Sequence, residues 1–202
     1  MLPHRDHASP SFQRIQRSRI DQILQIELDP VQVESFLGPM DDILTAVRHG
    51  LTHGMVGIHV DGLLIGFWVL HRDPRDAAVW WLGWFAMDHR QQGRGYGRQA
   101  MAAIMQAFQK LPGCRQARLL VSPLNLGAKR LYEAWGFRQI GIHPVTGELI
   151  MECRVASGFP GSDLASCPPP TMAARVRRAR RGPRLEAGPH AVRMVGVERG
   201  PP

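Results

Sequence analysis

Alternating glycines make one short segment of this chain well suited to hold an anion. Glycines leave one side of a tight turn free of side chains, so successive main-chain N–H groups can converge on a negative charge. Helical apolar spacing follows from residue 98 to residue 110, and a helix N-terminus favours a phosphate by about 0.3 to 2 kcal/mol. We therefore predict a diphosphate site in this glycine turn; a surface turn without a ligand is the alternative. The turn reads Gln92-Gly93-Arg94-Gly95-Tyr96-Gly97, and Arg98 adds a further positive charge.

The spacing of these glycines excludes two common nucleotide loops. A Walker loop ends in Gly-Lys-Ser or Gly-Lys-Thr, whereas Gly97 is followed by Arg98. A dinucleotide fingerprint needs Gly-x-Gly-x-x-Gly, which residues 93–97 do not provide. The turn therefore indicates neither ATP nor NAD.

A second segment combines helical spacing with an asparagine and a phenol. Residues 125–137 have the form Asn-x-x-Ala-x-x-Leu-Tyr-x-x-x-Gly-Phe, with apolar residues at helical spacing. Asn125 is placed to cap the N-terminus of this helix. Tyr132 has an ordinary pKa near 10, so at physiological pH it is neutral and still carries a phenolic proton to donate. Packing on the buried face of the helix is the alternative role for Tyr132.

In this order and about 30 residues apart, the two segments resemble the signature segments of the GNAT superfamily of N-acetyltransferases. The resemblance implies that the glycine turn wraps the pyrophosphate of acetyl-CoA, a co-substrate used without a metal. It also implies that the N–H of Met87 contacts the oxyanion, that Tyr132 is catalytic and donates to the CoA sulfur, and that Asn125 contacts pantetheine or pyrophosphate. The residues that it assigns to acetyl-CoA are Met87, Gln92, Gly93, Arg94, Gly95, Tyr96, Gly97, Arg98 and Asn125.

The general base remains unassigned in the sequence. An amine acceptor has a pKa of about 10.4, so roughly one molecule in a thousand is neutral near pH 7.5, and a proton must leave before attack. Some GNAT relatives place a glutamate on the fourth strand, but residues 79–86 contain no carboxylate. Asp88 and His89 are expected to be loop residues. A water chain or a side chain from the first helices is left for the role.

The order of expected elements resembles the GNAT fold over about residues 12–155. The fold class is α/β of the α+β type, with a central mixed, mostly antiparallel sheet of about six or seven strands and helices on both faces. The resemblance implies that the fourth and fifth strands splay apart around the pantetheine arm. We expect the strand at 78–87 to be buried on both faces. The expected order is a strand at 12–16, helices at 19–28, 31–37 and 41–47, strands at 55–60, 63–71 and 78–87, a helix after the glycine turn, a strand at 117–121, a helix at 125–135, and strands at 137–142 and 149–155.

Composition divides the chain into three parts. We expect a flexible arm at 1–11, the acetyltransferase domain at 12–156 and a disordered basic tail at 157–202. The tail holds 8 Pro, 6 Gly and 8 Arg and lacks Trp and Tyr, so it cannot bury enough apolar area to offset chain entropy. Its residues 175–181 could hold RNA, DNA or an acidic membrane by counterion release, although an extension without such a role is the favoured interpretation.

The first helices carry charge of one sign. Between residues 20 and 47 there are six acids and no Lys or Arg, which would attract a cationic acceptor if this segment lines the cleft. We therefore expect Glu27, Asp29 and Glu34 to bind the acceptor; a solvated acidic helix face is the alternative. Residues 87–97 and 147–152 also look similar to bacterial GNAT enzymes that act on spermidine and spermine.

These observations predict an N-acetyltransferase that moves an acetyl group from acetyl-CoA to a primary amine, such as that of a polyamine. A non-catalytic CoA-sensing or nucleic-acid-associated module that uses the basic tail is the alternative. Three widely spaced cysteines, no apolar N-terminal segment and no long apolar run favour a cytoplasmic protein without a membrane span, disulfide framework or metal knuckle. The oligomeric state is left open, a homodimer included.

Overall fold

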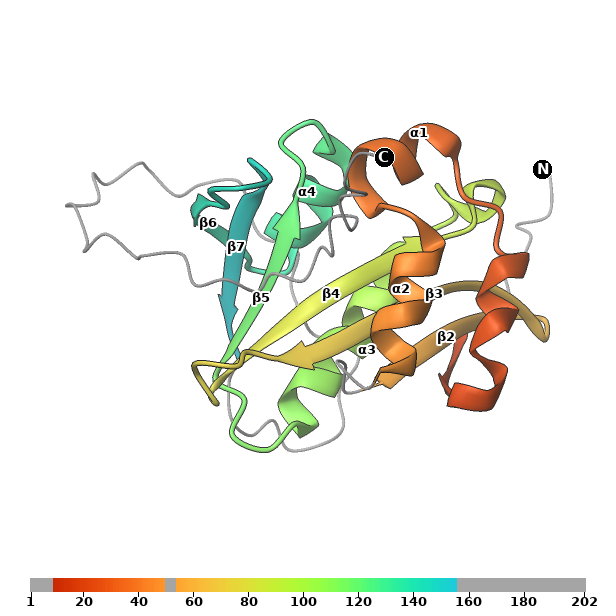
Figure 1. Ribbon diagram of the computed structural model, residues 1–202, viewed down its shortest axis with the longest axis horizontal. Helices are drawn as coiled ribbons and strands as arrows, with labels where there is room; N and C mark the ends of the chain where they lie inside the picture. Colours follow the sequence, from red (N-terminus) through yellow and green to blue (C-terminus); the bar gives the residue numbers. More distant parts are fainter. Residues whose placement is uncertain (1–8, 50–53, 156–202) are drawn as a thin grey trace, which may run out of the picture.

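The described residues fold around a seven-stranded sheet (Figure 1). The computed structural model describes residues 9–49 and 54–155. The strand order is β1-β2-β3-β4-β5-β7-β6, in which β4 and β5 are parallel and all other neighbours are antiparallel. This mixed sheet, with helices on both faces, confirms the expected fold class.

The element bounds follow the expected order closely. The strands are β1 (Ser11–Ile15), β2 (Gly54–Val60), β3 (Leu63–Arg72), β4 (Val79–Met87), β5 (Gln116–Val121), β6 (Arg138–Ile142) and β7 (Leu149–Arg154). The helical elements are the 3₁₀ helix η1 (Arg17–Gln25), α1 (Pro30–Gln32), the π-helical turn η2 (Val33–Leu37), α2 (Met40–Arg48), the 3₁₀ turn η3 (His89–Gln91), α3 (Tyr96–Lys110) and α4 (Leu126–Ala134). The segment before α2 is therefore less regular than its helical spacing indicates, because it contains 3₁₀ and π-helical turns, whereas α2 is a regular helix as expected.

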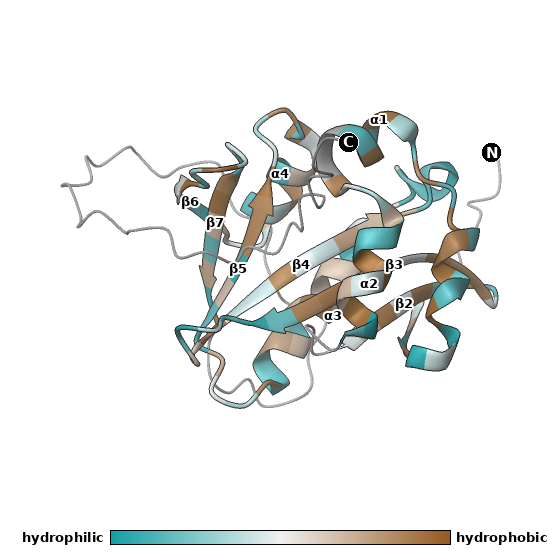
Figure 2. Ribbon diagram, in the orientation of Figure 1, coloured by the Kyte–Doolittle hydropathy of each residue, from teal (hydrophilic) through white to brown (hydrophobic). Residues whose placement is uncertain are grey.

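Two apolar cores lie on opposite faces of the sheet. Helices α3 and α4 cover one face, where Ile104 belongs to the same buried cluster as Leu82 of β4. Elements η1 and α2 cover the other face, where Ile43 clusters with Phe67 of β3. In Figure 2, β5 and much of β2 and β3 are brown and β4 is mostly pale, whereas α2 shows teal on its outer side. Burial of these two faces fixes the sheet between its helices.

Strands β4 and β5 part at a β-bulge. Their pairing ends at Leu82 and Leu119, although β4 continues to Met87. On the edge that faces β3, Leu82 pairs with Leu70 and Trp84 pairs with Val69. Gly83, between them, is therefore an extra residue without a partner in the β3–β4 ladder. Because a bulge bends its strand and increases the local twist, β4 turns away from β5, as Figure 1 shows. The splayed strand pair is thus confirmed.

The expectation that the fourth strand is buried on both faces holds only before the bulge. Residues 79–82 are buried, whereas Gly83 is exposed and Trp84 and Phe85 are half-buried. The loss of β5 as a neighbour explains this change, since the second half of β4 borders an open gap. The aromatic residues of β4 do not indicate this gap at the level of sequence.

The expected domain boundaries at residues 11/12 and 156/157 stay predictions. The segment 157–202, including the arginine-rich residues 175–181, lies outside the described residues, and so do residues 1–8 of the expected arm. Within the described ranges, helices are too short or too polar to cross a membrane.

Candidate active site

A cavity of about 450 Å³ occupies the gap between β4 and β5. One of its sides is formed by the glycine turn and α4, through Gly93, Gly97 and Tyr132. Residues of the first helices, including Gln32 and Leu37, line another part. The cavity therefore collects segments that lie far apart in the sequence at the point where the sheet opens.

The geometry of the glycine turn suits an anion. Gly93 and Gly95 have φ values of 75° and 86°, which L residues rarely adopt. A Cβ at either position would meet no atom within 4 Å, so packing does not explain these glycines. The amides of Arg98 and Gln99 bond to the Gly95 carbonyl. Within the described residues, the amides of Gly93, Arg94, Gly95 and Gly97 have no protein acceptor, which leaves them available to a ligand.

The side chains of the turn point in different directions. Arg94 and Arg98 are exposed, so their charges can reach an anion at the surface. Tyr96 is only 3% exposed and belongs to the core between α3 and the sheet. The Tyr96 ring is therefore part of the packing and is not presented to a ligand.

The main chain of Met87 faces the gap. The amide of Asp88 donates to the Ile65 carbonyl at 2.8 Å, and antiparallel ladders alternate between bonded and non-bonded pairs. Met87, opposite Gly66, is therefore in a non-bonded pair, and its N–H and C=O point away from β3. The Met87 carbonyl accepts from the Gln92 amide at 3.0 Å, which ties the glycine turn to the end of β4. The Met87 N–H is directed toward the cavity.

Gln92 also joins the turn to the first helices. Its side-chain amide pairs reciprocally with that of Gln32, with N–O distances of 2.9 and 3.1 Å. The side chain thus positions the turn. Contact between Gln92 and the cofactor stays a prediction.

Tyr132 is buried at the end of the cavity nearest α4. The residue is 7% exposed, and its ring packs on Phe137 at a centroid distance of 6.0 Å. Burial raises the pKa of the phenol well above its ordinary value, so the group stays protonated throughout the physiological range. Among the described residues, no hydrogen-bond partner is found for its hydroxyl. A buried, protonated phenol that borders the cavity is suited to donate to a ligand.

Two compatible roles are expected of Asn125, a cap at the N-terminus of α4 and a contact with the cofactor. Its side chain caps α4 by accepting from the Ala128 amide at 3.1 Å, and Asn125 also lines the cavity. The cap is observed; contact with a cofactor stays a prediction.

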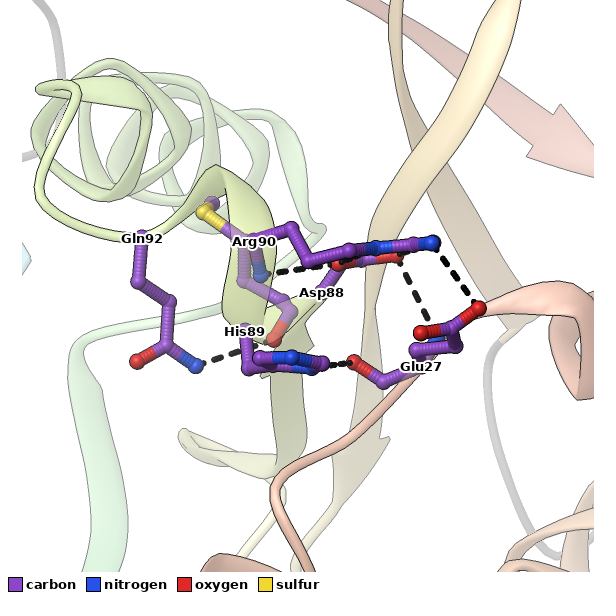
Figure 3. Close-up of polar contacts among 6 residues, drawn as sticks. Glu27, Asp88, His89, Arg90 and Gln92 are labelled. Carbon is purple, nitrogen blue, oxygen red and sulfur yellow. Dashed lines mark hydrogen bonds and ion pairs between the residues drawn. The ribbon is translucent and has the colours of Figure 1, made fainter.

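A closed polar cluster follows β4 directly (Figure 3). We call Glu27, Asp88, His89 and Arg90 the Asp88 cluster. Asp88 is 4% exposed and binds the Arg90 guanidinium through both carboxylate oxygens, at 3.1 and 2.8 Å. The Arg90 hydrogen bonds lower the pKa of Asp88 to about 2. The Glu27 carbonyl accepts from the His89 main chain at 2.9 Å, and Arg90 pairs with the Glu27 carboxylate at 2.8 Å. Asp88 and His89 are therefore structural, as expected of loop residues.

The three acids predicted to bind the acceptor lie outside the cavity lining. Glu27 pairs with Arg90. The Asp29 carboxylate caps α1, accepting from Val31 at 2.8 Å, and Glu34 is exposed. The ionisable side chains that do line the cavity, within the described residues, are His71, Tyr132 and Glu148. Sequence reasoning missed His71 and Glu148 as site residues, because their positions depend on the sheet and on the β6–β7 turn.

Metal ligation finds no support in the described residues, since no three His, Cys, Asp or Glu side chains gather into a candidate site there. Within the described residues, the polar groups that line the cavity are instead main-chain amides, a phenol, an imidazole, a single carboxylate and the side chains of Gln32, Gln92, Ser122 and Asn125. Such a set fits the polar groups of a phosphate-bearing carrier and of an amine.

Comparisons with known proteins agree with this geometry. The model of the acetyltransferase (GNAT) family matches residues 20–137. The spermine/spermidine N(1)-acetyltransferase of Bacillus subtilis (strain 168) is 32% identical over 102 residues, which cover 48% of this chain and 66% of that relative, slightly less than two thirds of its length. An aminoglycoside acetyltransferase solved with coenzyme A has a TM-score of 0.61 at 17% identity, covering 72% of this chain and 95% of its own. The ribosomal-protein-S18-alanine N-acetyltransferase of Escherichia coli has a TM-score of 0.57 at 18% identity, covering 78% and 99%.

Proposed function

This chain belongs to the acetyltransferase (GNAT) family, and on that premise we propose that it transfers an acetyl group from acetyl-CoA to a primary amine of a small polycation. The observation that carries the proposal is the gap between β4 and β5, which joins a turn of unbonded amides to a buried phenol in one cavity. A thioester carrier with a diphosphate spans those two features.

The residues of the cavity fit the steps of acyl transfer. The N–H of Met87, directed into the gap, is placed to stabilise the oxyanion of the tetrahedral intermediate. The protonated phenol of Tyr132 is placed to donate to the departing thiolate. The scaffold's main contribution is to hold thioester and amine in line, which removes most of the entropic cost of their encounter.

A polycation is the acceptor that the cavity chemistry favours. Glu148 supplies a carboxylate, and Trp81, Trp84 and Phe85 supply aromatic surface, both of which attract ammonium groups. The Bacillus relatives named for spermine and spermidine support the same class. Glu27, Asp29 and Glu34 remain candidates for the outer part of the acceptor path, and KM measurements on Glu34 and Glu27 variants test this prediction.

The proposal is tested by thiol release from acetyl-CoA with a panel of amines. Purified full-length protein is expected to form CoA in an amine-dependent manner, fastest with spermidine or spermine and slower with a monoamine. Absence of amine-dependent release would favour a CoA-sensing module without catalysis. Tyr132→Phe is expected to lower kcat by about 100-fold while calorimetric CoA affinity is retained. A Tyr132→Phe variant as fast as wild type removes Tyr132 from the reaction.

Two matched carboxamide variants locate the acceptor site. Glu148→Gln is expected to raise KM for spermidine by about 10-fold, the size of one lost charge-assisted hydrogen bond. Glu34→Gln makes the same chemical change on the exposed first helices. A larger rise in the Glu34 variant would assign the acceptor to the acidic helical segment instead.

A further inference from the structure

Within the described residues, the cavity lining includes one imidazole, that of His71. β4 carries no carboxylate, and Asp88, directly after it, is held by Arg90. Of the ionisable groups that line the cavity within the described ranges, Tyr132 is protonated and Glu148 lies on the turn before β7. His71 is the remaining candidate for removal of the ammonium proton.

The imidazole of His71 lies beside the bulge where the strands part. His71 is opposite Trp81 in the β3–β4 ladder. A Cβ on Gly83 would lie 2.9 Å from the His71 Cδ2 and 3.3 Å from its Nε2, so only glycine at this position leaves room for the ring. The bulged residue and the imidazole therefore meet at the opening of the gap.

His71 and Tyr132 approach the gap from opposite faces of the sheet. The neighbours of His71 and Trp81 along their strands, Leu70 and Leu82, belong to the core beneath α3, as does Tyr132. Since side chains alternate along a strand, His71 and Trp81 point to the other face. An amine that enters from the His71 side can thus attack while the thiol leaves toward Tyr132.

Stacking and hydrogen bonding hold the ring in place. The His71 and Trp81 rings are 6.2 Å apart and almost parallel, at 3°. The Trp81 indole N–H donates to Asp73 at 2.8 Å, and Arg118 lies 5.9 Å from the Trp81 ring centroid. Arg118 is in turn bound to Glu152 at 2.8 Å. Contacts that connect β4, β5 and β7 therefore hold Trp81, and with it the stacked His71 ring, in position.

The surroundings of His71 favour its neutral form. Burial, the largest effect, lowers the pKa of the imidazole, while a hydrogen bond with the Arg72 backbone and the charge of Asp73 act in the opposite direction. Other charged groups near the stack, among the described residues, include Arg118 and Glu152, which pair with each other, Arg72, which donates to the Ala77 carbonyl, and Glu148, which lines the same cavity. A neutral imidazole near pH 7 has a lone pair that can accept a proton.

We propose that His71 is the general base of the acetyl transfer, an inference that rests on the function proposed above. His71 takes one proton from the acceptor ammonium, and the freed amine lone pair forms the C–N bond with the thioester carbon. The intermediate breaks its C–S bond, and the Tyr132 phenol gives its proton to the departing thiolate. The second amine proton leaves as the amide forms and returns the Tyr132 phenolate to the phenol. Each turnover releases one net proton, which leaves through His71 to solvent.

The test is the pH dependence of kcat/KM for spermidine in wild type and His71→Gln. Wild type is expected to lose activity as pH falls through the His71 pKa, below the ordinary value of about 6.5. His71→Gln is expected to lower kcat near pH 7 by about 100-fold. In this variant kcat/KM should rise with hydroxide concentration, whereas in wild type it should reach a plateau above the His71 pKa. CoA affinity is expected to stay unchanged. His59→Gln, the same change on neighbouring β2 and outside the cavity lining, is expected to keep the wild-type profile.

Gly83→Ala provides a test in which His71 is retained. The methyl group would displace the imidazole, so kcat is expected to fall by about 10-fold. The double variant Gly83→Ala/His71→Gln is expected to have the same kcat as His71→Gln alone, because both changes act through His71. A His71→Gln variant with wild-type kcat and acid limb overturns the assignment, as does a Glu148→Gln variant that loses the acid limb. Failure of wild type to release thiol with any amine would instead refute the proposed function.

Discussion

The Asp88 cluster and the glycine turn follow one another after β4, but they differ in whether their polar groups have hydrogen-bond partners within the protein. In the cluster, both Asp88 oxygens bond to Arg90 and the Glu27 carbonyl bonds to His89. In the turn, four main-chain amides have no protein acceptor among the described residues. The buried Asp88 carboxylate is satisfied within the protein, as buried polar groups normally are, whereas the exposed amides before α3 are free to bind an anion. Changes in the turn should alter binding, and changes in the cluster should alter stability.

The largest effect on this comparison is expected from Gly95→Val. A valine here brings a bulky side chain to the amides and forces φ away from 86°, so calorimetric CoA affinity should fall by about 1,000-fold, or about 4 kcal/mol. Gly113→Val is the matched control, because Gly113 also has a positive φ, 72°, and open space around its Cβ. Both variants should lose about 1 to 3 kcal/mol of stability from strain. Equal CoA affinities in the two would contradict a phosphate cradle at residues 92–97.

An intermediate effect is expected from Asp88→Asn. The Asp88 pKa is lowered from 3.8 to about 2, so its ionised form should contribute about 2 kcal/mol to the free energy of unfolding above pH 4. Because the folded pKa is depressed, this contribution should disappear as pH falls from about 4 to about 2. Urea unfolding at pH 7, 4, 3 and 2 should show Asp88→Asn less stable at pH 7 and similar to wild type at pH 2. A constant difference across this range would show that the carboxylate charge is not the cause.

Asp88→Asn should also leave the turn functional. CoA affinity in this variant is expected to stay within about threefold of wild type, less than 1 kcal/mol, because no recorded bond joins the Asp88 carboxylate to residues 92–97. A much larger loss of affinity would show that the cluster and the turn form one site.

The smallest effect is expected from Glu27→Gln. The Glu27–Arg90 pair is more than half exposed on both sides, and such pairs contribute less than about 1 kcal/mol. Urea unfolding at pH 7 should therefore change little, and KM for spermidine should change less than in Glu148→Gln. A 10-fold rise of KM in Glu27→Gln would restore Glu27 as an acceptor-binding residue.

Local features of the chain were predictable from the sequence because they depend on neighbouring residues. The Asp61-Gly62 hairpin, with φ values of 50° and 77°, follows from backbone preferences at two adjacent positions. The Asn125 cap needs a partner only three residues away. The glycine turn and its helix likewise lie within one segment, and the element order and family followed from these signals.

Tertiary structure alone decided the gap and its chemistry. Gly83 is a bulge only because β3 and β4 pair in a shifted register, and His71 reaches the cavity only through that pairing. Glu27 has its carboxylate occupied by a residue 63 positions away, and Glu148 lines the cavity because the turn before β7 folds back to it. The sequence by itself determined a glycine turn at a helix N-terminus and a phenol on a helix, since both arise from short-range geometry. Which carboxylates are free, and which imidazole meets the opened strands, depend on long-range packing that spacing does not encode.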